Sequence, residues 1–358
     1  MIRLLGLLVR LLGSGRIFAV KKFALACLKL LARPVYSGIG TILCLHRVVP
    51  AAQVSLLAAN RNLEITPEAL DALLNHIRKQ HYEIIPIDEV PAAIRKPPRR
   101  KFIVFTFDDG YLDTLTCALP VFRSHNAPFA VNITTGLIDH NILVWWHLLE
   151  HLFGHLDTLR YNDGSHKHEL PLGSLEEKNL AFSQLFQHIR SCSDRTTLDA
   201  FILSLFAGTG LEPWALSNAY MMNWSNVREL ASDNLVTIGA HTVRHLALSR
   251  LDPDQLRSEF LEAKTRLEAE LKRPVRHMAY PFGDPETVGA REFATARDCG
   301  FTTAVTTRST NIFRQHGGHL HSLPRINAGG DYQIIAAFSA SESGFRPARQ
   351  YRLRRVIV

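Results

Sequence analysis

Two pairs of side chains with metal-binding chemistry follow apolar segments of this chain. Asp108 and Asp109 come directly after residues 101–107, and His241 and His245 stand four residues apart after a second apolar run. Imidazole and carboxylate groups bind zinc and similar divalent metals, and two histidines with one carboxylate leave coordination positions for water and substrate. One of two adjacent carboxylates can bind the cation while its neighbour accepts a proton. The four residues therefore have the chemistry of a mononuclear metal hydrolase.

Each pair has a common structural explanation when it is taken alone. Asp-Asp-Gly sequences are frequent in turns and at helix N-termini, and a His-x-x-x-His spacing is a weak signal in a chain with 17 histidines. These explanations do not account for the position of both pairs at the ends of apolar runs. The combination favours a metal site.

Short buried strands are expected to position these residues. Residues 101–107 and 235–240 are mostly apolar, with β-branched or aromatic side chains, which is typical of buried strands in an α/β protein. Residues 252–271 place apolar side chains at helical spacing after an Asp-Pro start, which predicts a long helix. The sequence therefore predicts an α/β fold whose strand ends carry the chemistry.

The motifs resemble those of the polysaccharide deacetylases of the NodB-homology type, also called carbohydrate esterase family four. The first family motif, Thr-Phe-Asp-Asp-Gly, is matched by residues 106–110, and the second, His-Ser/Thr-x-x-His, by residues 241–245. The third motif ends in Pro-Tyr/Phe-Gly, which is matched by residues 281–283. The resemblance implies a distorted (β/α)7 barrel, with the active site at the carboxyl ends of the strands.

The resemblance also implies roles for individual residues. Asp109, His241 and His245 would bind the metal, Asp108 would be the general base, and a backbone N–H near Tyr111 would stabilise the oxyanion. The substrate-binding residues expected from the resemblance are Tyr111, Pro281 and Phe282. Trp145 and Trp146, discussed below, are two further candidates for substrate binding. The ligand set suits Zn²⁺ best, with Co²⁺, Ni²⁺ and Fe²⁺ as alternatives.

The chain departs from the family at the arginine that usually orients the base. The aligned position in the third motif is Ala279. Arg276 and Arg325 are the two candidates to supply this charge. A solvated arginine on the surface is the alternative for each.

A second departure concerns the general acid, because the C-terminal Leu-x-His motif of the family is missing. Residues 41–45 form an apolar run that ends in His46. This segment resembles the opening of the deacetylase branch in which the last strand has moved to the front. The resemblance implies that His46 is the general acid, and a histidine at the edge of the core is the alternative.

The expected catalytic domain covers residues 37–335 and contains an insertion at about residues 147–225. Residues 147–156, 175–192 and 198–206 are expected to be helical. Trp145 and Trp146, at the entry to this insertion, could stack on a sugar ring, or they could anchor the insertion in the core.

Basic residues are concentrated at the two ends of the chain. Residues 1–63 contain nine Lys or Arg and no Asp or Glu, and five arginines follow Glu342, in a chain with a net charge of +8. Residues 1–36 are expected to form a basic amphipathic segment at a membrane surface, with a helix packed on the barrel or a mitochondrial-type presequence as alternatives. Residues 336–358 form a basic tail. No motif for binding nucleic acid accompanies these charges.

Five scattered cysteines without a Cys-x-x-Cys pair favour a reducing compartment. No clean apolar core of a signal peptide is present. We therefore expect a peripheral protein on the cytoplasmic face of a membrane, with a soluble cytoplasmic protein as the alternative.

The expected activity is metal-dependent removal of N-acetyl groups from amino sugars of a surface glycan or a lipid-linked saccharide precursor. A hydrolase that removes a formyl or O-acetyl group would use the same residues. A non-catalytic, membrane-tethered glycan-binding module is the third alternative, but such a module would be expected to have lost a ligand or the base.

Overall fold

The computed structural model describes residues 35–163 and 166–330, together with residues 335, 338, 339, 343 and 356. The predicted basic segments at residues 1–36 and 336–358 lie almost entirely outside these described residues. Within them, none of the helices is long and apolar enough to cross a membrane.

An eight-stranded sheet forms the centre of the molecule. Its strands run in the order β11-β10-β9-β6-β5-β1-β12, and β4 pairs with the start of β5. All of these pairs are parallel. The strands in chain order are β1 (Gly40–Leu45), β4 (Glu83–Ile84), β5 (Phe102–Phe107), β6 (Phe129–Ile133), β9 (Val236–Ala240), β10 (His277–Ala279), β11 (Thr303–Val305) and β12 (Ile326–Asn327).

The segment that contains β12 joins the two edges of the sheet. Leu323 forms a parallel bridge with Val305 of β11, and Ile326 pairs with Leu43 of β1. The sheet therefore curls into a ring, with a distortion where this segment passes from one neighbour to the other. The arrangement is a distorted (β/α)7 barrel, so the predicted fold class is confirmed.

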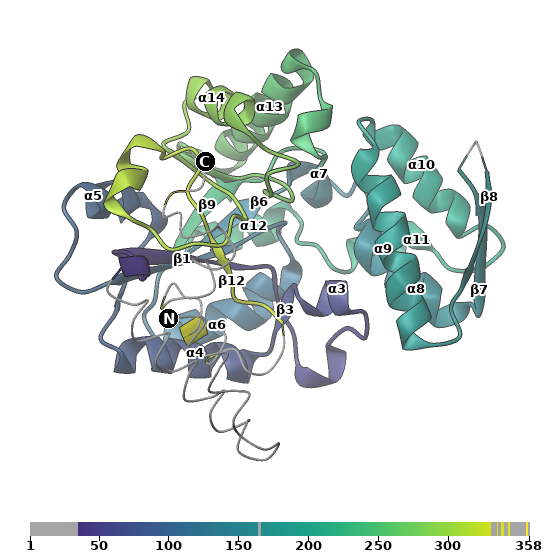
Figure 1. Cartoon of the computed structure of the whole chain (residues 1–358), viewed down its shortest axis with the longest axis horizontal. Helices are drawn as coiled ribbons and strands as arrows, with labels where there is room; N and C mark the ends of the chain where they lie inside the picture. The colour runs from purple at the N-terminus through teal and green to yellow at the C-terminus, as the bar shows by residue number, and fades with distance from the viewer. Residues whose placement is uncertain are drawn as a thin grey trace, which may run out of the picture.

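Helices pack around the outside of this barrel, with α13 and α14 on one side and α4 and α6 on the other (Figure 1). The long predicted helix is α13, and the Asp252 side chain caps it by accepting a hydrogen bond from the Gln255 amide. The helices of the barrel are α3 (Ala58–Arg61), α4 (Pro67–Lys79), α5 (Val90–Arg95), α6 (Leu119–Ser124), α7 (Thr135–Ile138), α12 (Trp224–Ala231), α13 (Pro253–Leu271) and α14 (Ala290–Asp298). The short strands β2 (Arg47–Val48) and β3 (Glu64–Ile65) pair with each other.

A mostly helical segment between β6 and β9 lies beside the barrel, at the right of Figure 1. The helices expected at residues 147–156, 175–192 and 198–206 correspond to α8, α9 and α10. The hairpin of β7 and β8 was not expected, because its short strands are largely polar and carry no long apolar run. The elements of this segment are α8 (Trp145–His155), β7 (Thr158–Asn162), β8 (Lys167–Pro171), α9 (Leu175–Ser191), α10 (Arg195–Leu205) and α11 (Pro213–Asn218).

Candidate active site

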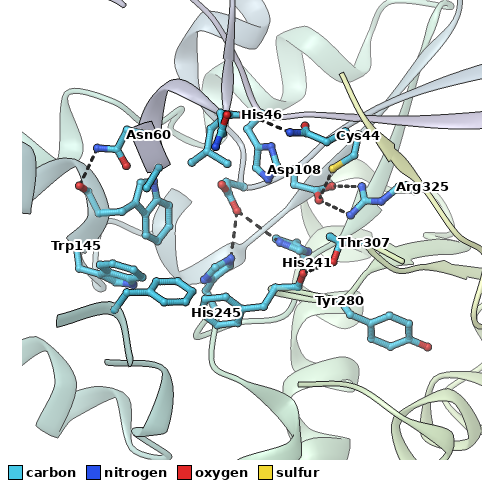
Figure 2. A pocket seen from close by; sticks show the side chains of 18 of the residues that line it. Cys44, His46, Asn60, Asp108, Trp145, His241, His245, Tyr280, Thr307 and Arg325 are labelled. Carbon is cyan, nitrogen blue, oxygen red and sulfur yellow. Dashed lines mark hydrogen bonds and ion pairs between the residues drawn. The ribbon is translucent and has the colours of Figure 1, made fainter. Parts of the chain in front are cut away.

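The side chains predicted to share a site converge at the carboxyl ends of the strands. Asp108 and Asp109 follow β5, His241 follows β9 and His46 follows β1. Because these strands are parallel, their carboxyl ends meet at one end of the barrel. These residues and His245 line a single cavity of about 360 Å³ (Figure 2).

Asp109, His241 and His245 bring three ligand atoms together. Asp109 Oδ1 lies 3.5 Å from His241 Nε2 and 3.3 Å from His245 Nε2. Two ligands of a tetrahedral zinc ion at ordinary bond lengths are separated by about 3.4 Å. Asp109 Oδ1 is buried and has no hydrogen-bond partner among the described residues. A bound cation would supply the missing partner of this oxygen. The spacing and the orphaned oxygen both fit a divalent metal.

His241 and Asp109 also have the protonation states that metal ligands need. His241 Nδ1 lies 2.8 Å from the backbone oxygen of Ala279, so the proton belongs on Nδ1, and Nε2 faces Asp109 as a free acceptor. Burial lowers the pKa of His241 to about 4, which keeps the imidazole neutral near pH 7. Burial raises the pKa of Asp109, but the neighbouring histidines outweigh burial and hold this pKa below its ordinary value.

The backbone around the ligands adopts an uncommon conformation. Asp109, Thr242, His245 and Phe282 all have positive φ angles, between 51° and 74°. Such angles are strained for residues other than glycine, and they persist where the surrounding structure imposes them. The tightly packed loops at the strand ends therefore hold the ligands in position.

A buried arginine fixes Asp108 in one orientation. Arg325 Nη1 and Nη2 donate hydrogen bonds to Asp108 Oδ1 and Oδ2 at 2.8 and 2.6 Å, and Arg325 Nε donates to the backbone oxygen of Thr306. Burial raises the pKa of Asp108, but the Arg325 guanidinium outweighs burial and holds this pKa far below its usual range. Asp108 is therefore ionised, and both of its oxygens are held.

Arg276, the other predicted partner of Asp108, lies away from the cavity. It is exposed and precedes β10, so it stands at the amino end of that strand, opposite the carboxyl ends that surround the cavity. Arg276 is not among the residues that line the cavity, whereas Arg325 is. The prediction that named both arginines is corrected in favour of Arg325.

Two residues that the sequence did not single out also contact Asp108. Asn132 of β6 donates to Asp108 Oδ1 at 2.8 Å, and the Cys44 thiol of β1 donates to Oδ2 at 3.7 Å. His46 lies close by, with a ring nitrogen within 4.8 Å of ligand atoms of Cys44 and Asp108, and burial lowers its pKa. The sequence signal that could have identified Asn132 is its position as a polar residue inside an apolar strand.

Aromatic side chains of the inserted segment form one wall of the cavity. Trp145 and Trp146 begin α8, and Phe182 and Phe186 come from α9. The centroid of the Trp146 ring lies 5.2 Å from the ring centroid of the candidate ligand His245. Both tryptophans are buried and both line the cavity. The two explanations considered for them are therefore compatible, because a side chain that anchors α8 also faces the cavity.

Two of the predicted substrate-binding residues do not line the cavity, whereas the predicted Phe282 does. Tyr111 is fully buried, and Trp146 Nε1 donates to its hydroxyl at 2.6 Å. The backbone bridge between Tyr111 and Met221 is formed by the N–H groups of Leu112 and Met222. The bridge therefore does not use the backbone N–H of Tyr111. Pro281 is also buried. The Tyr111 hydroxyl therefore acts as a structural acceptor, and any substrate contact of this residue would involve its backbone.

Part of the chain that forms this site matches a known protein family. The family model described as "Polysaccharide deacetylase" matches residues 201–304. The match covers 104 of the 358 residues, and this part of the chain is similar to a polysaccharide deacetylase domain. The matched residues include His241 and His245, whereas Asp108 and Asp109 precede them in the chain and reach the same cavity through β5. The predicted family and the predicted enzyme class, a deacetylase, are confirmed.

Solved structures share the fold over most of the chain. The deacetylase PplD of Streptococcus pyogenes, in complex with acetate, has a TM-score of 0.54 and 18% identity, over 85% of this chain and 97% of that chain. IcaB from Ammonifex degensii has a TM-score of 0.52 and 17% identity, over 85% and 97%. A polysaccharide deacetylase from Bacillus cereus has a TM-score of 0.52 and 15% identity, over 85% and 68%. None of the curated proteins matches the chain in sequence.

Proposed function

We propose that this deacetylase domain is a metal-dependent hydrolase that removes N-acetyl groups from amino sugars of a cell-envelope glycan or of its lipid-linked precursor. One observation carries the proposal: the ligand atoms of Asp109, His241 and His245 converge beside an aspartate held by a buried arginine. A glycan-binding module would need neither arrangement. The similar fold of PplD was solved with acetate, which is the product that this reaction requires.

The three ligand residues would hold the cation, for which we propose Zn²⁺ with Co²⁺, Ni²⁺ and Fe²⁺ as alternatives. A divalent cation at this position would polarise the acyl carbonyl and lower the pKa of the attacking water. We assign Asp108 to accept the proton of that water. The Cys44 thiol is the weakest of its hydrogen-bond donors, at 3.7 Å, so an incoming water can replace this contact while Arg325 stays in place.

We assign His46 as the general acid, which gives a proton to the leaving amine. Breaking the C–N bond leaves an amine that must gain a proton, and acetate leaves with the oxygen of water. His46 lies on the same side of the cavity as Asp108, which allows it to donate to the leaving nitrogen. We assign the Tyr111 backbone N–H to the developing oxyanion. The aromatic wall, with Phe282, would pack against the apolar face of the sugar or against the acyl methyl group.

The proposed setting is the cytoplasmic face of a membrane, where a lipid-linked saccharide would present its sugar to the cavity. The support for this proposal is the basic character of residues 1–63, which carry nine Lys or Arg and no acidic residue. Basic residues near anionic lipid contribute about 1 kcal/mol each to membrane binding. Sedimentation with vesicles of anionic and of neutral lipid tests it. Binding to neither kind of vesicle would favour a soluble enzyme.

The experiment that tests the activity measures acyl release from free and lipid-linked N-acetylhexosamine saccharides. The purified protein is assayed as isolated, after chelation and after addition of each candidate metal. Acetate release that is lost on chelation and restored by metal is expected. Release of formate, or of acetate from O-acetyl esters alone, would identify one of the related hydrolases, and tight saccharide binding without release would identify a binding module.

A further inference from the structure

Asn60 presents an unpaired side-chain oxygen at the edge of the cavity. It belongs to the short helix α3, is fully buried and lines the same cavity as the candidate catalytic residues. Its Oδ1 has no hydrogen-bond partner among the described residues. Figure 2 shows the Asn60 carboxamide on the opposite side of the cavity from Arg325.

The orientation of the Asn60 amide follows from its neighbours. Asn60 Nδ2 donates to the backbone oxygen of Trp146 at 2.9 Å and to Glu150 Oε2 at 2.8 Å. Both partners are acceptors only, so the nitrogen must face them. A flipped amide would place its oxygen against a carbonyl and a carboxylate. The side-chain oxygen is therefore fixed on the side away from Trp146 and Glu150.

The inserted segment also fixes the position of α3 itself. Glu150 Oε1, from α8, accepts hydrogen bonds from the amides of Leu56 and Leu57 at 2.7 and 3.2 Å. Asn179 Oδ1, from α9, accepts from the amide of Ala58 at 2.9 Å. These side chains satisfy the amides of the two residues that precede α3 and the first amide of α3, whose own N-cap residue provides no side-chain cap. The inserted helices thus hold Asn60 at the cavity with a defined direction.

A buried acceptor without a donor destabilises the fold in the absence of a ligand, so its presence in a cavity wall points to a ligand that supplies the donor. We propose that Asn60 Oδ1 accepts a hydrogen bond from the saccharide, from a hydroxyl or amide N–H, and that Glu150 is its positioning residue. This inference rests on the proposed function, because the donor belongs to the amino sugar that the site deacetylates. Asn60 would then discriminate among sugars, whereas Asp108 and the metal ligands act on the acyl group.

The test compares the Asn60→Ala variant with the wild-type protein on two substrates. One is an N-acetylated oligosaccharide, and the other is 4-nitrophenyl acetate, which carries an acetyl group but no sugar donor. We expect kcat/KM for the saccharide to fall by about 10-fold to 100-fold through a higher KM, with no change for the aryl ester and with metal content retained. A deoxy sugar that lacks the recognised donor should be hydrolysed equally by both proteins.

Asn179→Ala is the matched control, because it removes one backbone hydrogen bond of α3 but leaves both partners that orient the Asn60 amide, Trp146 and Glu150, in place. It should preserve the ratio of saccharide to ester activity, even if its melting temperature falls. Glu150→Ala should lower this ratio as Asn60→Ala does. Equal losses of Asn60→Ala on both substrates, or no loss on the saccharide, would overturn the proposal.

A failure of the proposed function gives a different result from a failure of this inference. If the wild-type protein releases acetate from no saccharide, calorimetric binding of an N-acetylglucosamine oligosaccharide replaces the kinetic measurement. A dissociation constant at least about 10-fold weaker for Asn60→Ala would still support the hydrogen bond. Equal dissociation constants, or no binding to either protein, would reject the inference.

Discussion

Arg325 and Asp108 stand 217 residues apart in the chain, yet they form two hydrogen bonds of 2.8 and 2.6 Å in the core of the barrel. Arg325 is 1% exposed and Asp108 is 2% exposed, so neither charge is screened by solvent. The segment before β12 brings the arginine beside the carboxyl end of β5. This pairing positions a buried, ionised aspartate next to the candidate metal ligands.

Replacing Arg325 by Met should abolish most activity without removing the metal ligands. The change leaves the Asp108 carboxylate buried without its partner, which costs about 3–5 kcal/mol of stability. A second change, Asp108→Asn, in the same chain should recover part of the melting temperature but none of the activity. Arg276→Met is the control and should retain wild-type kcat/KM and stability, because Arg276 is exposed at the other end of β10. Full activity of Arg325→Met would contradict the orienting role.

Asp108→Asn and His241→Ala should separate catalysis from metal binding. Asp108→Asn is expected to lower kcat by about 10²-fold or more, as loss of a general base does, while one metal ion per chain remains by elemental analysis. His241→Ala should lose both the metal and the activity. Metal at about 100 times its dissociation constant raises the unfolding free energy by about 2.7 kcal/mol, so chelation should lower the melting temperature of Asp108→Asn but not of His241→Ala. An active Asp108→Asn variant would remove Asp108 from the role of base.

His46→Gln should affect substrates according to their leaving group. An amine needs a proton to leave, whereas the 4-nitrophenolate of an aryl acetate is a stable anion at neutral pH. The variant is therefore expected to lose about 10²-fold in kcat on the amide and to keep most of its activity on the aryl ester. Parallel losses on both substrates would indicate that His46 has a structural role at the edge of the core.

His316 makes the stability of the fold sensitive to acid at a position outside the cavity lining. Burial lowers the pKa of His316 to about 4, below the ordinary value of about 6.5 in the unfolded chain. Between these values the unfolded chain binds a proton that the folded chain does not, so the unfolding free energy falls as pH decreases from 6.5 towards 4. From pH 7 to pH 5 this amounts to about 2 kcal/mol. Urea unfolding of His316→Gln should show a pH dependence weaker by that amount, and equal slopes would reject the assignment.

Much of the site could be predicted from local sequence. Asp108, Asp109 and His241 each follow an apolar run that is long enough for a buried strand and too short for a buried helix. Parallel strands place such residues at a common edge, so the sequence also predicted their convergence. The helix at Pro253–Leu271 was predicted for a similar reason, because its apolar spacing and its Asp252 cap are local signals.

Other features could not be predicted because they depend on partners that are distant in the chain. Nothing local distinguishes Arg276 from Arg325, since each is an arginine beside an apolar segment. The role of Asn60 depends on Trp146 and Glu150, about 90 residues later in the chain. The hairpin of β7 and β8 depends on pairing between two largely polar segments.

The sequence by itself determined which residues can bind a metal and move protons, because residue type and strand position are encoded locally. Only the tertiary structure decided which arginine contacts Asp108. It also decided that the inserted helices hold Asn60 at the cavity. The physical reason is that burial and hydrogen-bond partners are properties of the packed barrel. A guanidinium or an amide acquires its role only when folding removes water and places particular hydrogen-bond partners around it.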